Sequence, residues 1–190
     1  MLTYNGNWNI GDVIIKDRND DGKIDSEDKT VIGNSIPRFT FGINLGFNYK
    51  NFDFSCFFQG VGKADGYVKD ELIIPMGIYS ALKEHYTDSF NPENPNPNAY
   101  FPRITNSWMY NYGNMQHWVQ NASYIRLKNL QIGYTFDIAK MGIDKVRLMV
   151  SGENLFTLTK FRIWDPETKV GDRSTYPHVA VYSFGVNLLF

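Results

Sequence analysis

The stretch VYSFGVNLLF, residues 181–190, indicates the fold more clearly than any other part of the chain. Apolar Tyr182, Phe184, Val186, Leu188 and Phe190 alternate in it with polar or small Ser183, Gly185 and Asn187. Because successive side chains of a strand point to opposite faces, the stretch predicts a strand with one apolar face. Tilted strands of about 9–11 residues cross a bilayer, so the length fits a membrane-spanning strand.

The same alternation recurs upstream and is strictest in FTFGINLGFNY, residues 39–49. The apolar phase slips next to Lys128, which predicts a β-bulge or a strand that leaves the membrane there. On the polar face of a later strand, Arg147 and Glu153 are expected to form an ion pair or to be solvated. In all we predict antiparallel strands at about 38–49, 52–61, 124–136, 145–158 and 181–190, together with a short helix within 78–86.

The connections between these strands alternate in length. Lys50–Asn51 and Asp137–Asp144 are short, whereas the connections over about 62–122 and 160–180 are long. Outer-membrane barrels have short periplasmic turns and long extracellular loops. With the carboxyl terminus in the periplasm, both long connections and residues 1–36 fall outside the cell. The expected fold is therefore all-β, an incomplete segment of a transmembrane β-barrel with strands over 37–190.

Composition argues against several other classes of protein. The net charge of −1 gives no field that would attract nucleic acid. Cys56 is the sole cysteine, so no disulfide framework is expected. The chain has no run of 18 apolar residues, so no membrane helix is predicted. The three histidines lack metal-binding spacing, and no nucleophile or phosphate motif of an enzyme occurs. The opening MLTYNGNWNI lacks the regions of a signal peptide, so we expect a piece of a longer protein.

One acidic stretch, DRNDDGKIDSED at residues 17–28, has the spacing of a calcium-binding loop. Calcium takes 6–8 oxygen ligands, which an EF-hand loop supplies at fixed positions around a glycine turn. The predicted ligands are the side chains of Asp17, Asn19, Asp21, Asp25 and Asp28 and the backbone carbonyl of Lys23. Asp28 stands where an EF-hand has glutamate, and no flanking helices are evident. The alternative is an acidic surface turn stabilised by Asx hydrogen bonds.

Aromatic residues crowd the longer connection, at Trp108, Tyr110, Tyr112 and Trp118. Aromatic faces stack on sugars, and tyrosine and tryptophan anchor protein interfaces. The sequence leaves two roles open for these four residues: contact with a glycan, or packing of the loop and contact with a partner protein.

Several segments together resemble one family. They are GDVIIKDRNDDGKIDSEDKTVIGNSIPRFTFGINLGFNYKNFDFSCFFQGVG (11–62), NASYIRLKNLQIGYTF (121–136), VSGENLFTLTKF (150–161), WDPE (164–167) and YSFGVNLLF (182–190). In this order they resemble the carboxyl-terminal part of the SusC/RagA family of TonB-linked outer-membrane transporters, which is typical of Bacteroidota.

The resemblance implies a barrel of about 22 strands around a plugged lumen. It further implies import of glycans or peptides with energy relayed by TonB, a SusD-like surface lipoprotein as partner, and no catalysis. The TonB-contacting and plug segments would lie outside this chain. By resemblance, Phe190 would be part of the signal for barrel assembly.

A second interpretation belongs to a different class: a secreted, calcium-binding β-sandwich, such as a carbohydrate-binding module or an adhesin. The two differ in what covers the apolar strand face, which meets lipid in a transporter and another sheet in a sandwich.

Overall fold

The computed structural model describes residues 9–69, 72–75, 82–105, 111–113, 115–140, 142–168 and 176–190. These residues divide into two compact units. The sheet unit comprises residues 35–65 together with the described parts of 121–190. The loop unit comprises residues 9–34 and the described parts of 66–120.

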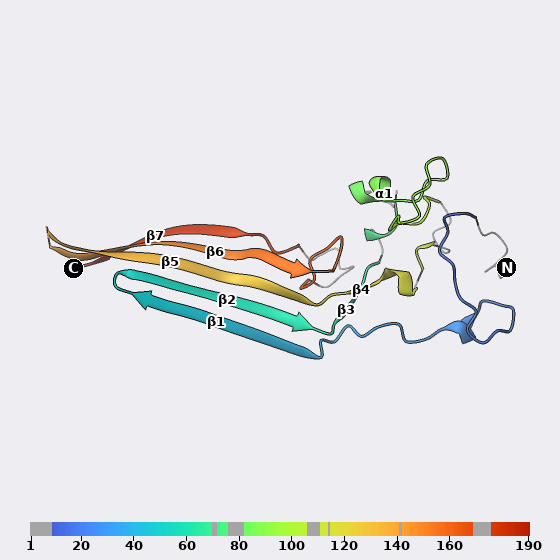
Figure 1. The fold of residues 1–190 in the computed structure, drawn as a ribbon, viewed down its shortest axis with the longest axis horizontal. Coiled ribbons are helices and arrows are strands. Elements are labelled where there is room, and N and C mark those ends of the chain that lie inside the picture. Colours follow the sequence, from blue (N-terminus) through green and yellow to red (C-terminus); the bar gives the residue numbers. More distant parts are fainter. Residues whose placement is uncertain are drawn as a thin grey trace. The chain divides into compact units, whose positions relative to one another are not determined.

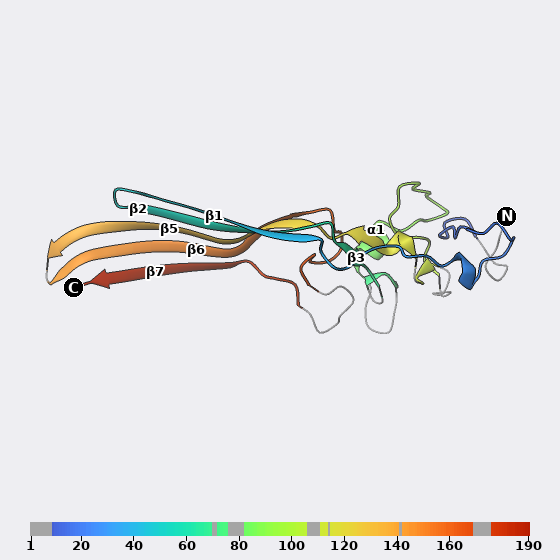
Figure 2. The same cartoon turned by 90° about the horizontal axis from the view of Figure 1, so that it is seen from below.

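The sheet unit is built on one antiparallel sheet with the strand order β1-β2-β5-β6-β7 (Figures 1 and 2). Its strands are β1 (Phe39–Tyr49), β2 (Phe52–Gly62), β5 (Tyr124–Lys140), β6 (Ile143–Thr159) and β7 (Val181–Leu189). Each of these five strands pairs antiparallel with the next one in chain order, so all five predicted strands are present.

Two of the strands continue further than the sequence pattern predicts. The predicted connection Asp137–Asp144 is wrong, because β5 extends to Lys140 and pairs with β6 from Ile143 onward, across a register shift after Asp137. Asp and Lys side chains interrupt the apolar alternation here, but a backbone ladder needs no apolar side chain. The other short turn falls where it was predicted, at Lys50, which has a φ of 54°.

The predicted irregularity near Lys128 is confirmed as a bulge. The pairing of β5 with β6 shifts between Leu127 and Asn129, and the pairing of β2 with β5 shifts between Phe57 and Phe58. On β6 the same region includes Asn154, whose φ is 52°. The bulge restores the apolar phase, so Leu127 lies opposite Phe156 and the apolar residues above and below it share a face.

The loop unit contains little regular structure. It includes η1 (Ser26–Asp28), α1 (Lys83–Thr87) and η3 (Gln116–Trp118), and α1 is shorter than the helix predicted within 78–86, of which 78–81 lie outside the described residues. A two-stranded sheet of β3 (Asp65–Tyr67) and β4 (Val119–Asn121) lies within the predicted loop and was not foreseen. The buried centre of the loop unit is formed by fully enclosed side chains: Val68, Ile73, His85, Asn111 and Trp118. In the part of the chain that the structure describes, no helix has the length and apolar character needed to cross a membrane.

Candidate functional site

The first functional feature is an apolar face that continues across the whole five-stranded sheet. Strand registry places Phe54 on β2 between Phe47 on β1 and Ile132 on β5. Ile132 lies opposite Val150 on β6, and Val150 lies opposite Phe184 on β7. Because paired residues of an antiparallel sheet share a face, these side chains form one continuous apolar surface. The predicted apolar positions of all five strands lie on it.

This apolar face is exposed. Phe184 is 69% exposed, Val150 55% and Leu45 54%. A β-sandwich would bury such residues between two sheets, but the only other sheet among the described residues has two strands of three residues each. The sandwich alternative is therefore not supported, whereas a lipid-facing surface requires this arrangement.

The opposite face of the sheet is polar and holds an ion pair between distant strands. Asp53 on β2 accepts hydrogen bonds from Arg147 on β6, at 2.9 Å from Nε and 2.6 Å from Nη2. Gly133 on the intervening β5 makes room, because a Cβ there would lie 2.4 Å from Asp53 Oδ1 and 2.7 Å from Arg147 Nη2. The pairing of Arg147 with Glu153 is thus wrong. Arg147 extends across the glycine to β2, while Glu153 lies opposite Asn129.

A second group of charges, here called the ionic cluster, lies on the same polar face around Arg126. The Arg126 guanidinium donates to Asp165 Oδ1 at 2.6 Å, to Glu167 Oε2 at 2.8 Å and to Thr157 Oγ1 at 2.7 Å. Lys128 Nζ donates to Glu167 Oε2 at 2.8 Å. Arg126 is only 3% exposed, so the two carboxylates serve to compensate a nearly buried cation.

The acids of the ionic cluster come from the connection between β6 and β7. Burial raises the pKa of Asp165, but hydrogen bonds from Arg126 and from the amides of Glu167 and His178 outweigh that effect and hold the pKa below its usual value. His178 Nδ1 also lies 3.3 Å from Asp165 Oδ2. Asp165, Glu167 and His178 are the one group of described acidic, histidine or cysteine side chains with ligand atoms within 4.8 Å of one another.

The sequence patterns did not predict this cluster. Its members come from two segments, YIRLK (124–128) and WDPE (164–167), which were noted for resemblance but given no role. The available signal was that buried basic residues within a strand pattern require acidic partners elsewhere. Neither the alternation of the strands nor the histidine spacing identifies which acids those are.

The predicted calcium loop is folded around its own backbone amides. Asp17 is buried and accepts from the amides of Asp20 at 2.8 Å and Gly22 at 2.9 Å, and Asp28 accepts from Arg18 at 2.6 Å and Asp25 at 2.8 Å. Amides of Arg18 and Asp25 hold the pKa of Asp28 below its usual value, so this carboxyl is charged at neutral pH.

The remaining predicted ligands show the same Asx bonding. Asn19 accepts from the Asp21 amide at 3.3 Å, and Asp21 accepts from the Lys23 amide at 2.8 Å. The positive φ angles of Asp20 (60°) and Gly22 (87°) provide the sharp turn that a calcium loop needs. The donor chemistry and the turn fit the ion, while these carboxylates do not form a converging group of the kind found at Asp165.

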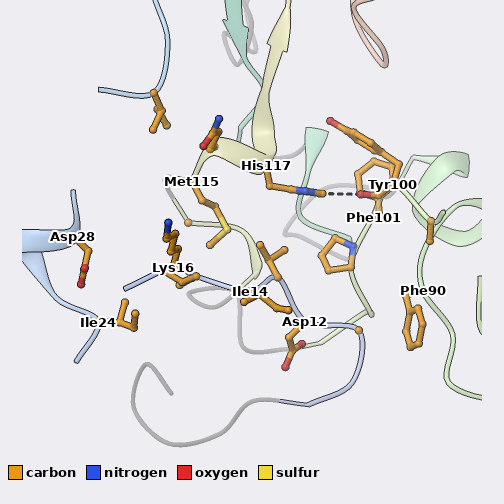
Figure 3. A pocket seen from close by; sticks show the side chains of 18 of the residues that line it. Asp12, Ile14, Lys16, Ile24, Asp28, Phe90, Tyr100, Phe101, Met115 and His117 are labelled. Carbon is orange, nitrogen blue, oxygen red and sulfur yellow. Dashed lines mark hydrogen bonds between the residues drawn. The ribbon is translucent and has the colours of Figure 1, made fainter. Parts of the chain in front are cut away.

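Next to this loop lies an open hollow of the loop unit. Its lining combines apolar Ile14, Ile24 and Met115 with charged Lys16 and Asp28 (Figure 3). On another side of the hollow His117 Nε2 lies 2.9 Å from the Tyr100 carbonyl oxygen, as the dashed line shows. The hollow has both apolar and charged walls but no converging set of catalytic groups that we can identify among its described lining residues.

Two of the four aromatic candidates lie inside the loop unit. Trp118 is fully buried and Tyr112 is 5% exposed, with their rings stacked 6.2 Å apart between centroids. Trp118 Nε1 donates to the Asn111 carbonyl oxygen at 2.9 Å, and burial raises the pKa of Tyr112 to about 12. Burial of this kind favours the packing role for these two residues. Trp108 and Tyr110 lie outside the described residues.

An all-β sheet with one exposed apolar face, one ionic face and long connections leaving from one end is a segment of a transmembrane β-barrel wall.

Comparison with known proteins agrees with this class of fold. The chain is 31% identical over 210 residues to TonB-dependent receptor P3 of Formosa agariphila, covering 99% of this chain and 20% of that protein. It is 27% identical over 179 residues to the TonB-dependent receptor SusC of Bacteroides thetaiotaomicron, covering 92% of this chain and 17% of that protein. No family model matches.

Solved structures show the same fold. A structure of the RagAB peptide transporter superposes with a TM-score of 0.67 at 22% identity, covering 88% of this chain and 19% of the transporter chain. The RagAB peptide importer in the open-open state superposes with a TM-score of 0.65 at 23% identity, covering 89% of this chain and 19% of that chain. The chain is therefore similar to one part of TonB-dependent receptors, SusC among them, and it spans about a fifth of the length of these relatives.

Proposed function

We propose that this chain forms part of the wall of an outer-membrane transporter that takes up nutrients, glycans or peptides, with energy relayed by TonB. The observation that carries the proposal is the sheet with two unlike faces. Its apolar side suits hydrocarbon, and its other side carries Asp53, Arg147 and the ionic cluster toward a wet lumen. Binding and translocation would involve no covalent chemistry by the chain.

The relatives support the finer parts of this proposal. Two TonB-dependent receptors, one of them SusC, and the RagAB peptide transporter are among the similar proteins. We infer a SusD-like surface lipoprotein as partner and outer-membrane lipid as surroundings. Co-purification of such a lipoprotein with the tagged receptor, and uptake of glycan and peptide mixtures by cells with and without it, would test partner and cargo separately.

The orientation of the sheet is tested by spin labels at adjacent positions. In the full receptor in liposomes, a label at Val150→Cys is expected to collide mainly with oxygen, which concentrates in lipid. A label at Ser151→Cys is expected to collide mainly with a water-soluble nickel complex. The two residues are neighbours on β6 and point to opposite faces. Equal access of the nickel complex to both labels would exclude a lipid-facing sheet.

We further propose that residues 17–28 bind Ca²⁺ outside the cell and stiffen the segment that precedes β1. The turn at Gly22 and the charged Asp28 support this proposal. Calorimetric titration of the receptor with calcium is expected to show binding that Asp17→Asn abolishes. The matched control is Asp144→Asn, which removes the same charge from an exposed position of β6. Absence of calcium-dependent heat at millimolar ion would refute the proposal.

A further inference from the structure

The donors of the ionic cluster lie in one row across the polar face. Gln59 on β2 pairs with Arg126 on β5, and Arg126 pairs with Thr157 on β6. Lys128 joins the row at the bulge. The three donors Gln59, Arg126 and Lys128 therefore stand on two adjacent strands, and Thr157 on the third strand accepts from Arg126.

Their acceptors, in contrast, stand on a segment without regular structure. Glu167 accepts from Arg126 Nη1 and Lys128 Nζ, both at 2.8 Å on Oε2, and from Gln59 Nε2 at 3.4 Å on Oε1. Asp165 accepts from Arg126 Nη2 at 2.6 Å, and its Oδ2 also accepts from the His178 amide at 3.1 Å. The rigid sheet thus presents cations, and a connection outside the sheet supplies the anions.

We propose that Arg126, Lys128 and Gln59 form a carboxylate-binding site on the lumen wall. In this conformation Glu167 of the chain itself fills the site. A molecule bearing a carboxylate takes the place of Glu167 when residues 161–168 lift from the sheet. The inference rests on the proposed function in that this polar face lines the lumen.

Charge and geometry both support this assignment. Two cations balance two carboxylates in the cluster, and a nearly buried guanidinium left without an anion is costly. An arginine with a neighbouring lysine and amide is the donor set that recognises carboxylates through charge-assisted hydrogen bonds. The site therefore demands an anion whenever Glu167 leaves it.

A metal ion at Asp165, Glu167 and His178 is the less favourable assignment. Both carboxylates already accept from Arg126, and Glu167 also accepts from Lys128. A divalent ion would have to approach two cations or displace them from the acids with which they pair. The cluster accordingly recognises anions in place of Glu167, rather than cations.

The test uses the full receptor in nanodiscs with glutarate as the probe and its uncharged diamide as the reference. An intramolecular carboxylate competes at a high effective concentration, so wild type is expected to bind glutarate weakly and Glu167→Gln to bind it about tenfold more tightly or better. Adding Lys128→Met to Glu167→Gln is expected to reverse the gain. Glu153→Gln, which removes the same charge from the polar face of β6 outside the ionic cluster, is expected to leave the affinity at the wild-type level.

A second measurement on unaltered protein guards against misfolding of a variant. Saturating glutarate, but not the diamide at equal ionic strength, is expected to speed hydrogen exchange in residues 161–168 while the strands stay protected. Equal glutarate affinity of wild type and Glu167→Gln, or unchanged exchange in 161–168, would overturn the inference. Neither measurement requires TonB or uptake, so failed uptake with intact glutarate binding would count only against the transport function.

Discussion

The two units of this chain use the same kinds of residue in opposite ways. In the sheet unit many large apolar side chains, such as Phe184, are exposed, and a cation, Arg126, is nearly buried. In the loop unit a group of aromatic rings is enclosed, with Trp118 fully buried against Tyr112 and Phe101. A water-exposed unit gains stability by burying aromatic rings, whereas a sheet in hydrocarbon gains it by burying polar groups. The contrast therefore identifies two different solvents along one chain.

The largest expected effect comes from removing the buried ring of the loop unit. Trp118→Ala is expected to cost about 3–5 kcal/mol by loss of packing and creation of a cavity. Because the sheet has its own backbone ladder, only the loop unit should lose protection in hydrogen exchange. The control is Tyr86→Ala on α1, whose ring is 60% exposed and whose removal should change little. Loss of protection throughout the sheet would show that the two units do not unfold separately.

A charge on the apolar face should have the next largest effect. Phe184→Arg is expected to cost about 2–4 kcal/mol if residue 184 lies near the middle of the bilayer. Ser183→Arg places the same charge on the other face of β7 and should be tolerated. Urea-dependent folding of the receptor into liposomes measures both variants. Equal destabilisation by the two would contradict the assignment of different solvents to the two faces.

Acid should weaken the loop unit through Asp12. Burial raises the pKa of Asp12, but hydrogen bonds from Arg103, Asn111 and the Asn9 amide outweigh it and hold the pKa below its usual 3.8. A carboxyl whose pKa is lower in the folded than in the unfolded state stabilises the fold at pH values above its unfolded-state pKa. This contribution is lost as the pH falls through the folded-state pKa. The protection factors of the loop unit, which compare exchange with the intrinsic rate at each pH, should therefore fall below about pH 4. In Asp12→Asn this dependence should be smaller, and an unchanged dependence would show that Asp12 is not its source.

The smallest expected effect concerns the polar face of the sheet. Gly133→Ala places a Cβ within 2.7 Å of both Asp53 and Arg147. Because the contacted atoms are the ends of flexible side chains, we expect a loss of about 1 kcal/mol in folding into liposomes. Gly46→Ala, whose Cβ would meet no atom closer than 3.4 Å, is the control. A similar loss at both glycines would show that strand propensity, and not the ion pair, is responsible.

Much of the sheet could be predicted because successive side chains of each strand face two different surroundings in turn, which gives the sequence a period of two. Alternation in residues 39–49 and 181–190 fixes which side chains share a face, and the slip at Lys128 reveals the bulge. The end of β5 could not be predicted in this way, since Asp137 and the residues after it pair through backbone groups that carry no sequence pattern. In the loop unit, β3 and β4 are too short for a period to appear.

The sequence by itself determined the five strands and the apolar face of each, because those depend on local periodicity along the chain. Only the tertiary structure decided which charges meet. Asp53 and Arg147 are 94 residues apart, and Arg126 and Glu167 are 41 apart. Such pairs depend on registry across several strands, on the space at Gly133 and on the path of an irregular connection, none of which leaves a periodic trace in the chain.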